Sequence, residues 1–277
     1  MHPPALRPSR SPARTSPARF GALLLTLVVL LAACSKGSTT TVEEAEPTTT
    51  TTTTATSASC DPRLDGYANH VAYANTTGSI NVYPAPGATT PSQTFEVPRK
   101  TDTDPPIEVP MVFLVTNEPT DNCDWMEVLL PIRPNGSKGW VKRSDVRLEG
   151  NNYRIVVDLN GFNLKAYAGD QVLLDTEIGV ARENRPTPGG VYYTTELLKP
   201  PNPNGVYGTY AFGLSGFSEV LTSFNGGQGQ LGIHGTNEPD KIGQRVSNGC
   251  IRLRNEDIDK LVASIQDPYG IRVEILA

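Results

Sequence analysis

The sequence predicts a mainly β protein with two consecutive β domains and one short helix, behind an export segment and a linker. Short runs of β-branched and aromatic residues, separated by Gly, Pro and Asn, recur from about residue 60 onward. From residue 152 these runs follow the pattern of a β-meander, and only residues 255–265 show the apolar period of a helix. We therefore divide the chain of 277 residues into 1–33, 34–59, 60–150 and 151–277.

The first 33 residues are typical of an export signal. Four arginines open the segment: Arg7, Arg10, Arg14 and Arg19. An apolar run of 13 residues, 21–33, follows, and it is too short for a permanent membrane helix, which needs about 20. The run ends in Leu31-Ala32-Ala33-Cys34, which resembles the lipobox of bacterial lipoproteins. That resemblance implies a Cys34 carrying diacylglycerol that anchors the mature chain to the membrane; an ordinary signal peptide with a chance cysteine is the alternative.

Residues 34–59 are expected to form an extended tether behind Cys34. The segment is dominated by Thr, with an unbroken run at 48–54, and has too few apolar residues to form a core. Because residues 1–33 contain four Arg and no acidic residue, their removal changes the formal charge from −5 to −9. A chain this acidic lacks the basic surface of a nucleic-acid-binding protein, so we expect no nucleic-acid partner.

Residues 60–150 are expected to form a small β domain. Strands are predicted at 112–115 and 126–130, and Gly139-Trp140-Val141 followed by 143–146 resembles the end of bacterial SH3-like domains. The resemblance leaves two interpretations open: a module that binds or positions the cell wall, or a small barrel that only packs on its neighbour.

Two of the four cysteines, Cys60 and Cys123, are expected to form a disulfide. Once Cys34 is assigned to lipid and Cys250 to a motif described below, these two remain as an even pair in an exported protein. A bridge between them would stabilise the fold by about 4 kcal/mol in the chain-entropy model. Two buried free thiols are the alternative.

The elements of residues 151–277 are predicted in order along the chain. The expected strands are 153–159, 164–168, 172–180, 191–196, 231–233 and 271–276, with a hairpin turn at 168–171 and a loop at 186–190. A single helix is expected with Asn255 as its cap and an apolar face: Ile258, Leu261, Val262 and Ile265.

Cys250 is the candidate nucleophile. Gly249 precedes it and permits a sharp turn that can expose a thiol and present backbone N–H groups to an oxyanion. A buried structural cysteine is the alternative. A cysteine nucleophile needs a base, usually His. Of the three histidines, His2 leaves with the signal and His70 lies near the start of the folded region, so His234, 16 residues before Cys250, is the candidate base.

The two segments around these residues resemble a known catalytic signature. His234-Gly235-Thr236, followed by Ser247-Asn248-Gly249-Cys250-Ile251-Arg252, is similar to the motif of L,D-transpeptidases with a YkuD-type catalytic domain. Further similarity lies in three upstream segments: 155–159, 185–190 and 210–216. The resemblance covers about residues 152–277 and implies an L,D-transpeptidase-type β-sandwich with one short helix.

The resemblance implies a cysteine acyltransferase without a cofactor. Cys250 would attack the carbonyl of the third residue of a peptidoglycan stem tetrapeptide, and the amine of a second stem would then form a 3→3 cross-link. His234 would be the base, oriented by the Gly235 carbonyl, while Gly249, Asn248 and Ser247 would form the oxyanion and substrate loop. Arg252 would bind a substrate carboxylate, brace the loop or form a structural ion pair. Many family members have His where this chain has Asn248.

Two further expectations concern the chemistry of this site. A neighbouring imidazolium would lower the pKa of the Cys250 thiol and produce a thiolate. Residues 210–216 and 217–230, rich in Gly and aromatic residues, would form a loop that keeps water from the thioester.

Other functions remain as alternatives. An L,D-carboxypeptidase would use the same residues with water as acceptor, and a non-catalytic wall-binding lipoprotein would have lost the chemistry. A sortase lacks support because its Thr-Leu-x-Thr-Cys run is missing, and one His with one Cys does not make a zinc site. The expected location is extracytoplasmic, at the membrane and facing the cell wall, with stem peptides as partners.

Overall fold

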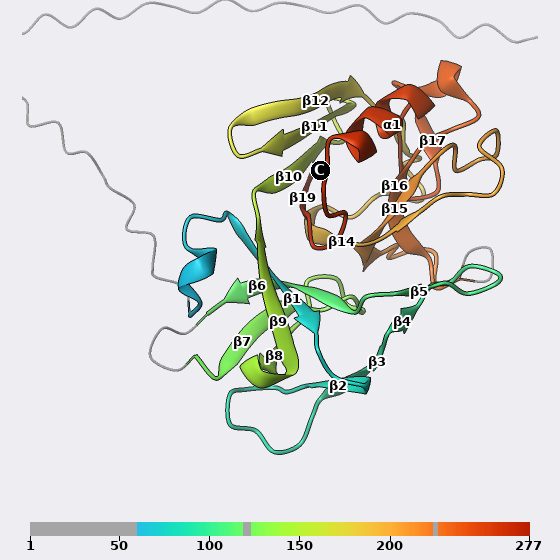
Figure 1. The fold of residues 1–277 in the computed structure, drawn as a ribbon. Coiled ribbons are helices and arrows are strands. Elements are labelled where there is room, and N and C mark those ends of the chain that lie inside the picture. The colour runs from blue at the N-terminus through green and yellow to red at the C-terminus, as the bar shows by residue number, and fades with distance from the viewer. Residues whose placement is uncertain (1–59, 119–122, 224–226) are drawn as a thin grey trace, which may run out of the picture. The chain divides into compact units, whose positions relative to one another are not determined.

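The structure, a computed structural model, describes residues 60–118, 123–223 and 227–277 (Figure 1). The predicted signal, Cys34 and the linker lie outside the described residues. The described residues all belong to one compact unit. In the described part of the chain, no helix is both long and apolar enough to cross a membrane.

The first sheet has five strands, all joined to their neighbours in antiparallel fashion (Figure 1). Its order is β8 (Lys138–Lys142), β7 (Trp125–Leu129), β6 (Val112–Asn117), β1 (Asn69–Ala74) and β9 (Val146–Asn151). Two ribbons accompany it: β2 (Gly78–Val82) with β3 (Gln93–Val97), and β4 (Arg99–Lys100) with β5 (Glu108–Val109). Two 3₁₀ turns complete this region: η1 (Pro62–Leu64) and η2 (Arg143–Asp145). We refer to residues 60–151 as the N-terminal domain; its likeness to SH3 domains stays a prediction.

The second sheet has eight strands and is drawn from yellow to red in Figure 1. Its order is β12 (Gln171–Glu177), β11 (Asn163–Ala168), β10 (Tyr153–Asp158), β19 (Arg272–Leu276), β14 (Gly190–Leu198), β15 (Ala211–Phe217), β16 (Gln230–His234) and β18 (Ile251–Arg252). A parallel ribbon joins β13 (Val180–Ala181) to β17 (Arg245–Ser247). We refer to residues 152–277 as the C-terminal domain. The mainly β fold class is confirmed.

The apolar pattern of the strands explains their burial. In β10, Ile155 and Val157 are buried while their neighbours are more exposed, as strand alternation requires. The β11–β12 hairpin turns at Gly169, whose φ of +59° suits a residue without a side chain. A core of apolar side chains from many of these strands also receives Ile258 and Leu261 of the helix. The domain is therefore built around one apolar cluster that supports the strands near the site.

The described residues contain one α-helix, α1 (Asn255–Ala263), and a third 3₁₀ turn, η3 (Pro239–Lys241). The predicted apolar face is correct, with Val262 and Ile265 partly buried against the core. The prediction that Asn255 caps the helix is wrong. Arg254 holds the cap position without a side-chain hydrogen bond, because the Asn255 amide is used elsewhere, as described below.

Candidate active site

Strands β16 and β18 bring His234 and Cys250 to one face of the second sheet. The strands run parallel, with Ile233 opposite Ile251. The Cys250 sulfur lies 3.9 Å from the point where a side chain on Gly232 would begin, so it occupies the space that this glycine leaves free. His234 is two residues beyond Gly232, and residues two apart on a strand share a face. Cys250, which directly precedes β18, therefore lies next to Gly232, and His234 follows on the same face of β16.

The His234 ring is held in a form that can accept a proton. Its Nδ1 lies 2.6 Å from the Gly235 carbonyl oxygen, and since a carbonyl only accepts, Nδ1 carries the hydrogen. The Nε2 of the neutral ring is then free of hydrogen. Burial lowers the pKa of His234 to about 4, the positive charge of Arg252 lowers it further, and the bond to Gly235 opposes the shift. The Tyr207 and His234 rings pack edge to face, with 5.0 Å between their centroids.

Cys250 is a partly exposed free cysteine, and burial of its sulfur raises the pKa of the thiol. A backbone hydrogen bond from Gly232 and the charge of Arg252 oppose this shift. Within the described residues no hydrogen bond joins the sulfur to the His234 ring. The direction of both pKa shifts opposes the expected thiolate beside an imidazolium. Both groups are removed from water, and a low dielectric favours the neutral pair.

A closed turn precedes Cys250. Ser247 Oγ donates to the Cys250 carbonyl at 2.6 Å and accepts the Gly249 N–H at 3.2 Å. Thr187 Oγ donates to the Gly249 carbonyl at 2.7 Å. Gly249 has a φ of +132°, which explains the glycine. Because the Gly249 N–H is already engaged by Ser247, the expectation that it serves an oxyanion hole does not hold in this state.

Asn248 and Arg252 have different partners. Asn248 Oδ1 accepts from Arg182 Nη1 at 3.0 Å and from Arg185 Nη1 at 2.8 Å. Of the roles kept open for Arg252, the structure shows an ion pair, with Nη1 3.0 Å from Glu238. The Asn248 amide therefore orders two nearby guanidinium groups, a contact between residues 63 and 66 positions apart that the sequence pattern did not reveal.

Asn255 clasps the segment that follows His234. Its Oδ1 accepts the Thr236 N–H at 2.9 Å, and its Nδ2 donates to the Pro203 carbonyl at 3.3 Å. A side chain on Gly235 would begin 2.3 Å from the same Oδ1, so the glycine permits this approach. The first turn of α1 thereby fixes the backbone whose carbonyl orients the catalytic candidate. Sequence reasoning had given Asn255 only a capping role.

The predicted cover over the site is wrong in its first half. Residues 211–217 form β15, in which Phe212 and Leu214 are fully buried. The alternation of large apolar residues with small ones is that of a strand within the sheet, and the glycines permit close packing: a side chain on Gly216 would meet the Tyr192 ring at 2.3 Å. The described residues contain no group of three or more His, Cys, Asp or Glu suited to a metal ion.

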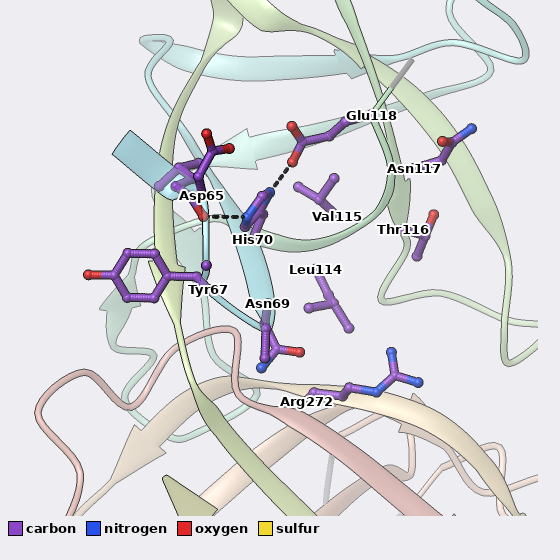
Figure 2. Close-up of a pocket in the computed structure, with 13 residues that line it drawn as sticks. Asp65, Tyr67, Asn69, His70, Leu114, Val115, Thr116, Asn117, Glu118 and Arg272 are labelled. Atoms are coloured by element: carbon purple, nitrogen blue, oxygen red, sulfur yellow. Dashed lines mark hydrogen bonds and ion pairs between the residues drawn. The ribbon is translucent and has the colours of Figure 1, made fainter. Parts of the chain in front are cut away.

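The second histidine of the sequence, His70, lies in the N-terminal domain at a cavity of about 340 Å³ (Figure 2). His70 Nδ1 pairs with Glu118, and Nε2 lies 3.1 Å from the Leu64 carbonyl. The hydrogen bond and charge of Glu118 raise the pKa of His70. Neither His234 nor Cys250 lines this cavity. Both ring nitrogens of His70 are thus engaged by its own domain.

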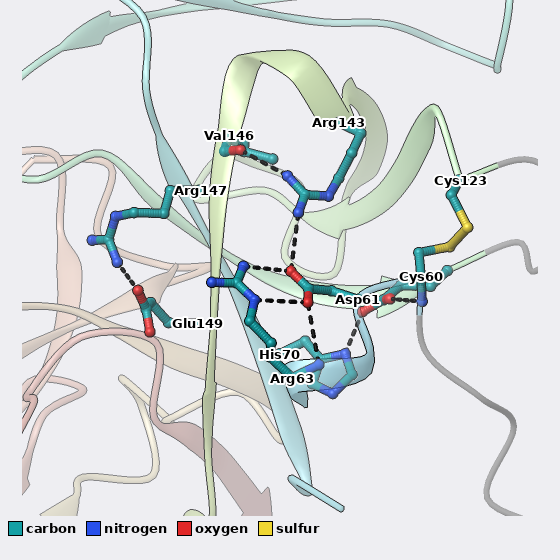
Figure 3. A network of polar contacts seen from close by, with 10 residues as sticks. Cys60, Asp61, Arg63, His70, Cys123, Arg143, Val146, Arg147 and Glu149 are labelled. Atoms are coloured by element: carbon teal, nitrogen blue, oxygen red, sulfur yellow. Dashed lines mark hydrogen bonds and ion pairs between the residues drawn. A yellow bond between two sulfur atoms is a disulfide. The ribbon is translucent and has the colours of Figure 1, made fainter. Parts of the chain in front are cut away.

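A disulfide joins Cys60 to Cys123, the pair left after the other two cysteines were assigned (Figure 3). Beside it, Asp61 accepts from Arg63 Nη2 at 2.6 Å and from Arg143 Nη2 at 3.2 Å. The hydrogen bonds from Arg63 lower the pKa of Asp61 to about 2. These contacts fix the first described residues onto the N-terminal sheet.

The C-terminal domain is an L,D-transpeptidase catalytic domain. Residues 152–275 match the family model of that description, YkuD. The putative L,D-transpeptidase YkuD of Bacillus licheniformis is 37% identical over 123 residues, which are 44% of this chain and 65% of the relative. The probable L,D-transpeptidase ErfK/SrfK of Escherichia coli is 42% identical over 78 residues, 28% of this chain and 19% of the relative. The chain thus spans less than two thirds of the length of each of these relatives.

Solved structures also resemble the chain. L,D-transpeptidase 3 from Mycobacterium tuberculosis has 14% sequence identity and a TM-score of 0.39, covering 60% of this chain and 91% of that one.

Proposed function

We propose that this protein is an exported peptidoglycan L,D-transpeptidase that forms 3→3 cross-links through an acyl-enzyme on Cys250. The placement of the sulfur over Gly232, on the face that carries His234, is the observation that carries the proposal. The family of the C-terminal domain supports the same reaction class.

In the first half-reaction, Cys250 Sγ attacks the carbonyl carbon of the third residue of a donor stem peptide. The thiol proton passes to His234 Nε2, which is free of hydrogen because Nδ1 is bound to Gly235. A neutral thiol and a neutral imidazole start the step, so the proton moves as the S–C bond forms rather than before it. Collapse of the tetrahedral intermediate breaks the C–N bond, and the amine of D-Ala leaves with the proton from His234.

In the second half-reaction, the side-chain amine of an acceptor stem attacks the thioester carbonyl. Its proton goes to His234 as the new amide forms, and the thiol of Cys250 is released with that proton. The energy of the original amide is kept in the thioester, so no ATP is required outside the membrane.

The neighbouring residues have assigned roles in this reaction. Thr187 and Ser247 hold the turn that presents Cys250. Because Ser247 occupies the Gly249 N–H, we assign the oxyanion contact to the Cys250 N–H. Arg182 and Arg185, ordered by Asn248, supply positive charge for a stem-peptide carboxylate.

We also propose that Cys34 carries the lipid that anchors the chain outside the cytoplasm, with 35–59 as the tether. The apolar run 21–33 and the small residues before Cys34 support this. Labelled fatty acid should be incorporated by the wild type in a bacterial host and not by Cys34→Ala. Equal labelling of both would refute the anchor.

Intact mass spectrometry with a carbapenem tests the acyl-enzyme. We expect one covalent adduct on the wild type and none on Cys250→Ala. A second assay with purified tetrapeptide stems separates the products: a cross-linked dimer supports the transpeptidase, and tripeptide alone identifies an L,D-carboxypeptidase. A wild type that forms no adduct and no product would leave a wall-binding protein.

A further inference from the structure

The geometry points to Arg133 and Asn135, two residues of the N-terminal domain, as positioning residues of the Cys250 site. They hold both described ends of the β15–β16 connection, which packs beside the turn carrying the sulfur. The expected effect on the reaction rate rests on the proposed function. The positioning of the connection rests on the contacts alone. It gives the N-terminal domain a part in the reaction, beyond the wall-binding and packing roles left open by the sequence.

Asn135 pairs with Phe217 as a strand residue would. Its Oδ1 accepts the Phe217 N–H and its Nδ2 donates to the Phe217 carbonyl, each at 2.8 Å. Phe217 is the last residue of β15 and pairs with Gln230 at the start of β16. The Asn135 amide therefore binds both the N–H and the carbonyl of Phe217 and fixes the end of β15.

One nitrogen of Arg133 binds three backbone carbonyls of the connection. Its Nη2 donates to the carbonyls of Ser218, Leu221 and Gln228 at 3.1, 3.2 and 2.7 Å. Its guanidinium also lies over the Phe217 ring, 4.7 Å from the centroid. Three carbonyl dipoles that converge on one point repel one another unless a cation or donor occupies it. Arg133 thus determines where the two ends of the connection meet.

A third contact comes from Asp102, whose carboxylate accepts the Gln228 N–H at 3.1 Å. These polar contacts border a cavity of about 380 Å³, lined by Asp102, Arg133 and Phe217 among others. Because this junction is hollow, apolar packing does not fix it, and directional hydrogen bonds do.

The connection lies beside the turn at Cys250. Ser218 N–H donates to the Gly229 carbonyl at 2.8 Å and closes the base of the connection. A side chain on Gly249 would begin 3.3 Å from Leu231 Cδ2 and 4.0 Å from Ser218 Cβ. A displacement of Ser218 or Leu231 therefore changes the space open to Gly249 and to the sulfur that follows. His234 lies at the other end of the same short strand as Leu231.

The test uses the mature chain with Asn135→Ala, Arg133→Ala and Arg133→Lys. Acylation by a tetrapeptide donor should fall roughly tenfold in both Ala variants, in kcat more than in KM, because small misplacements of reacting groups slow the reaction strongly. Alkylation of Cys250 by iodoacetamide should rise about threefold, since a loosened connection lets water reach the sulfur and lowers its pKa. Arg133→Lys keeps a positively charged donor near the three carbonyls and should retain part of the acylation rate and lower the alkylation rate toward the wild-type value.

Asn81→Ala is the matched control, because it removes one side-chain hydrogen bond, from Thr94, inside the β2–β3 ribbon. It should leave both rates unchanged. Lower melting temperatures with wild-type acylation and alkylation rates in the Ala variants would show a structural role only and overturn the inference. If the wild type itself does not acylate, the proposed function fails, and the alkylation rates still decide whether these residues position the sulfur.

Discussion

The two domains each contain one histidine, and their surroundings shift the two pKa values in opposite directions. In the N-terminal domain, the Glu118 carboxylate raises the pKa of His70. In the C-terminal domain, burial lowers the pKa of His234 to about 4. One ring has both nitrogens engaged by its own domain, and the other has Nδ1 fixed and Nε2 free of hydrogen. Residue type alone therefore does not identify a base; the pattern of partners does.

Removal of each histidine gives the largest expected contrast. His234→Ala should lower the acylation rate by about 10³-fold, the usual range for loss of a general base. His70→Ala should change that rate by less than about twofold while lowering the melting temperature, because it breaks an ion pair that is largely buried in the other domain. Single-turnover acylation and thermal unfolding measure the two effects. Equal loss of acylation in both variants would contradict the assignment of the base.

Acid sharpens the comparison because the two histidines act on stability in different pH ranges. The folded pKa of His234, about 4, is below its ordinary value of 6.5, so its protonation favours the unfolded chain. Stability should be complete above pH 6.5 and fall as the pH drops toward 4, by roughly 3 kcal/mol in total. His70 has a raised pKa, so its contribution is complete below pH 6.5 and is lost as the pH rises through its folded pKa.

Urea unfolding between pH 4 and 7 measures this effect. The wild type should lose stability across the range, and His234→Gln, which cannot titrate there, should lose much less. Asp61 does not interfere, because its stabilisation is lost only as the pH falls from 3.8 through its folded pKa of about 2. An identical slope in both proteins would contradict the lowered pKa of His234.

The sequence was sufficient for most strands of the C-terminal domain, and it singled out His234 and Cys250 as the candidate pair. Alternation in segments such as 153–158 predicts both a strand and its buried face. It failed at 210–216, where the glycines suggested a loop, although the flanking Phe212 and Leu214 are buried strand residues. A local sequence pattern shows the period of a strand. It does not show why a glycine is needed, because that depends on the side chain that packs against it.

The contacts that support the site could not be predicted from the sequence. Thr187 bonds Gly249 from 62 residues away, and Asn135 bonds Phe217 from 82 residues away. Such pairs depend on how the strands are ordered in space, which no local pattern states. The direction of the pKa shifts could not be predicted for the same reason, because burial of His234 and Cys250 depends on how the domain packs.

The smallest expected effect concerns Asn255. Variants of this residue separate its effect on the stability of α1 from its effect on the position of His234. Asn255→Ala removes the acceptor of the Thr236 N–H and should lower kcat about tenfold with little change in KM, because the Gly235 carbonyl that orients His234 loses its support. Asn255→Asp keeps that acceptor and adds a favourable charge in the first turn of α1, while it loses the donor to the Pro203 carbonyl, so it should retain more of the rate than Asn255→Ala. Asn163→Ala, which removes side-chain hydrogen bonds within β11 and β12, is the control and should leave kcat unchanged. A wild-type kcat in Asn255→Ala would mean that the Gly235 carbonyl is held by the chain fold alone, through the bond of its own N–H to Tyr210.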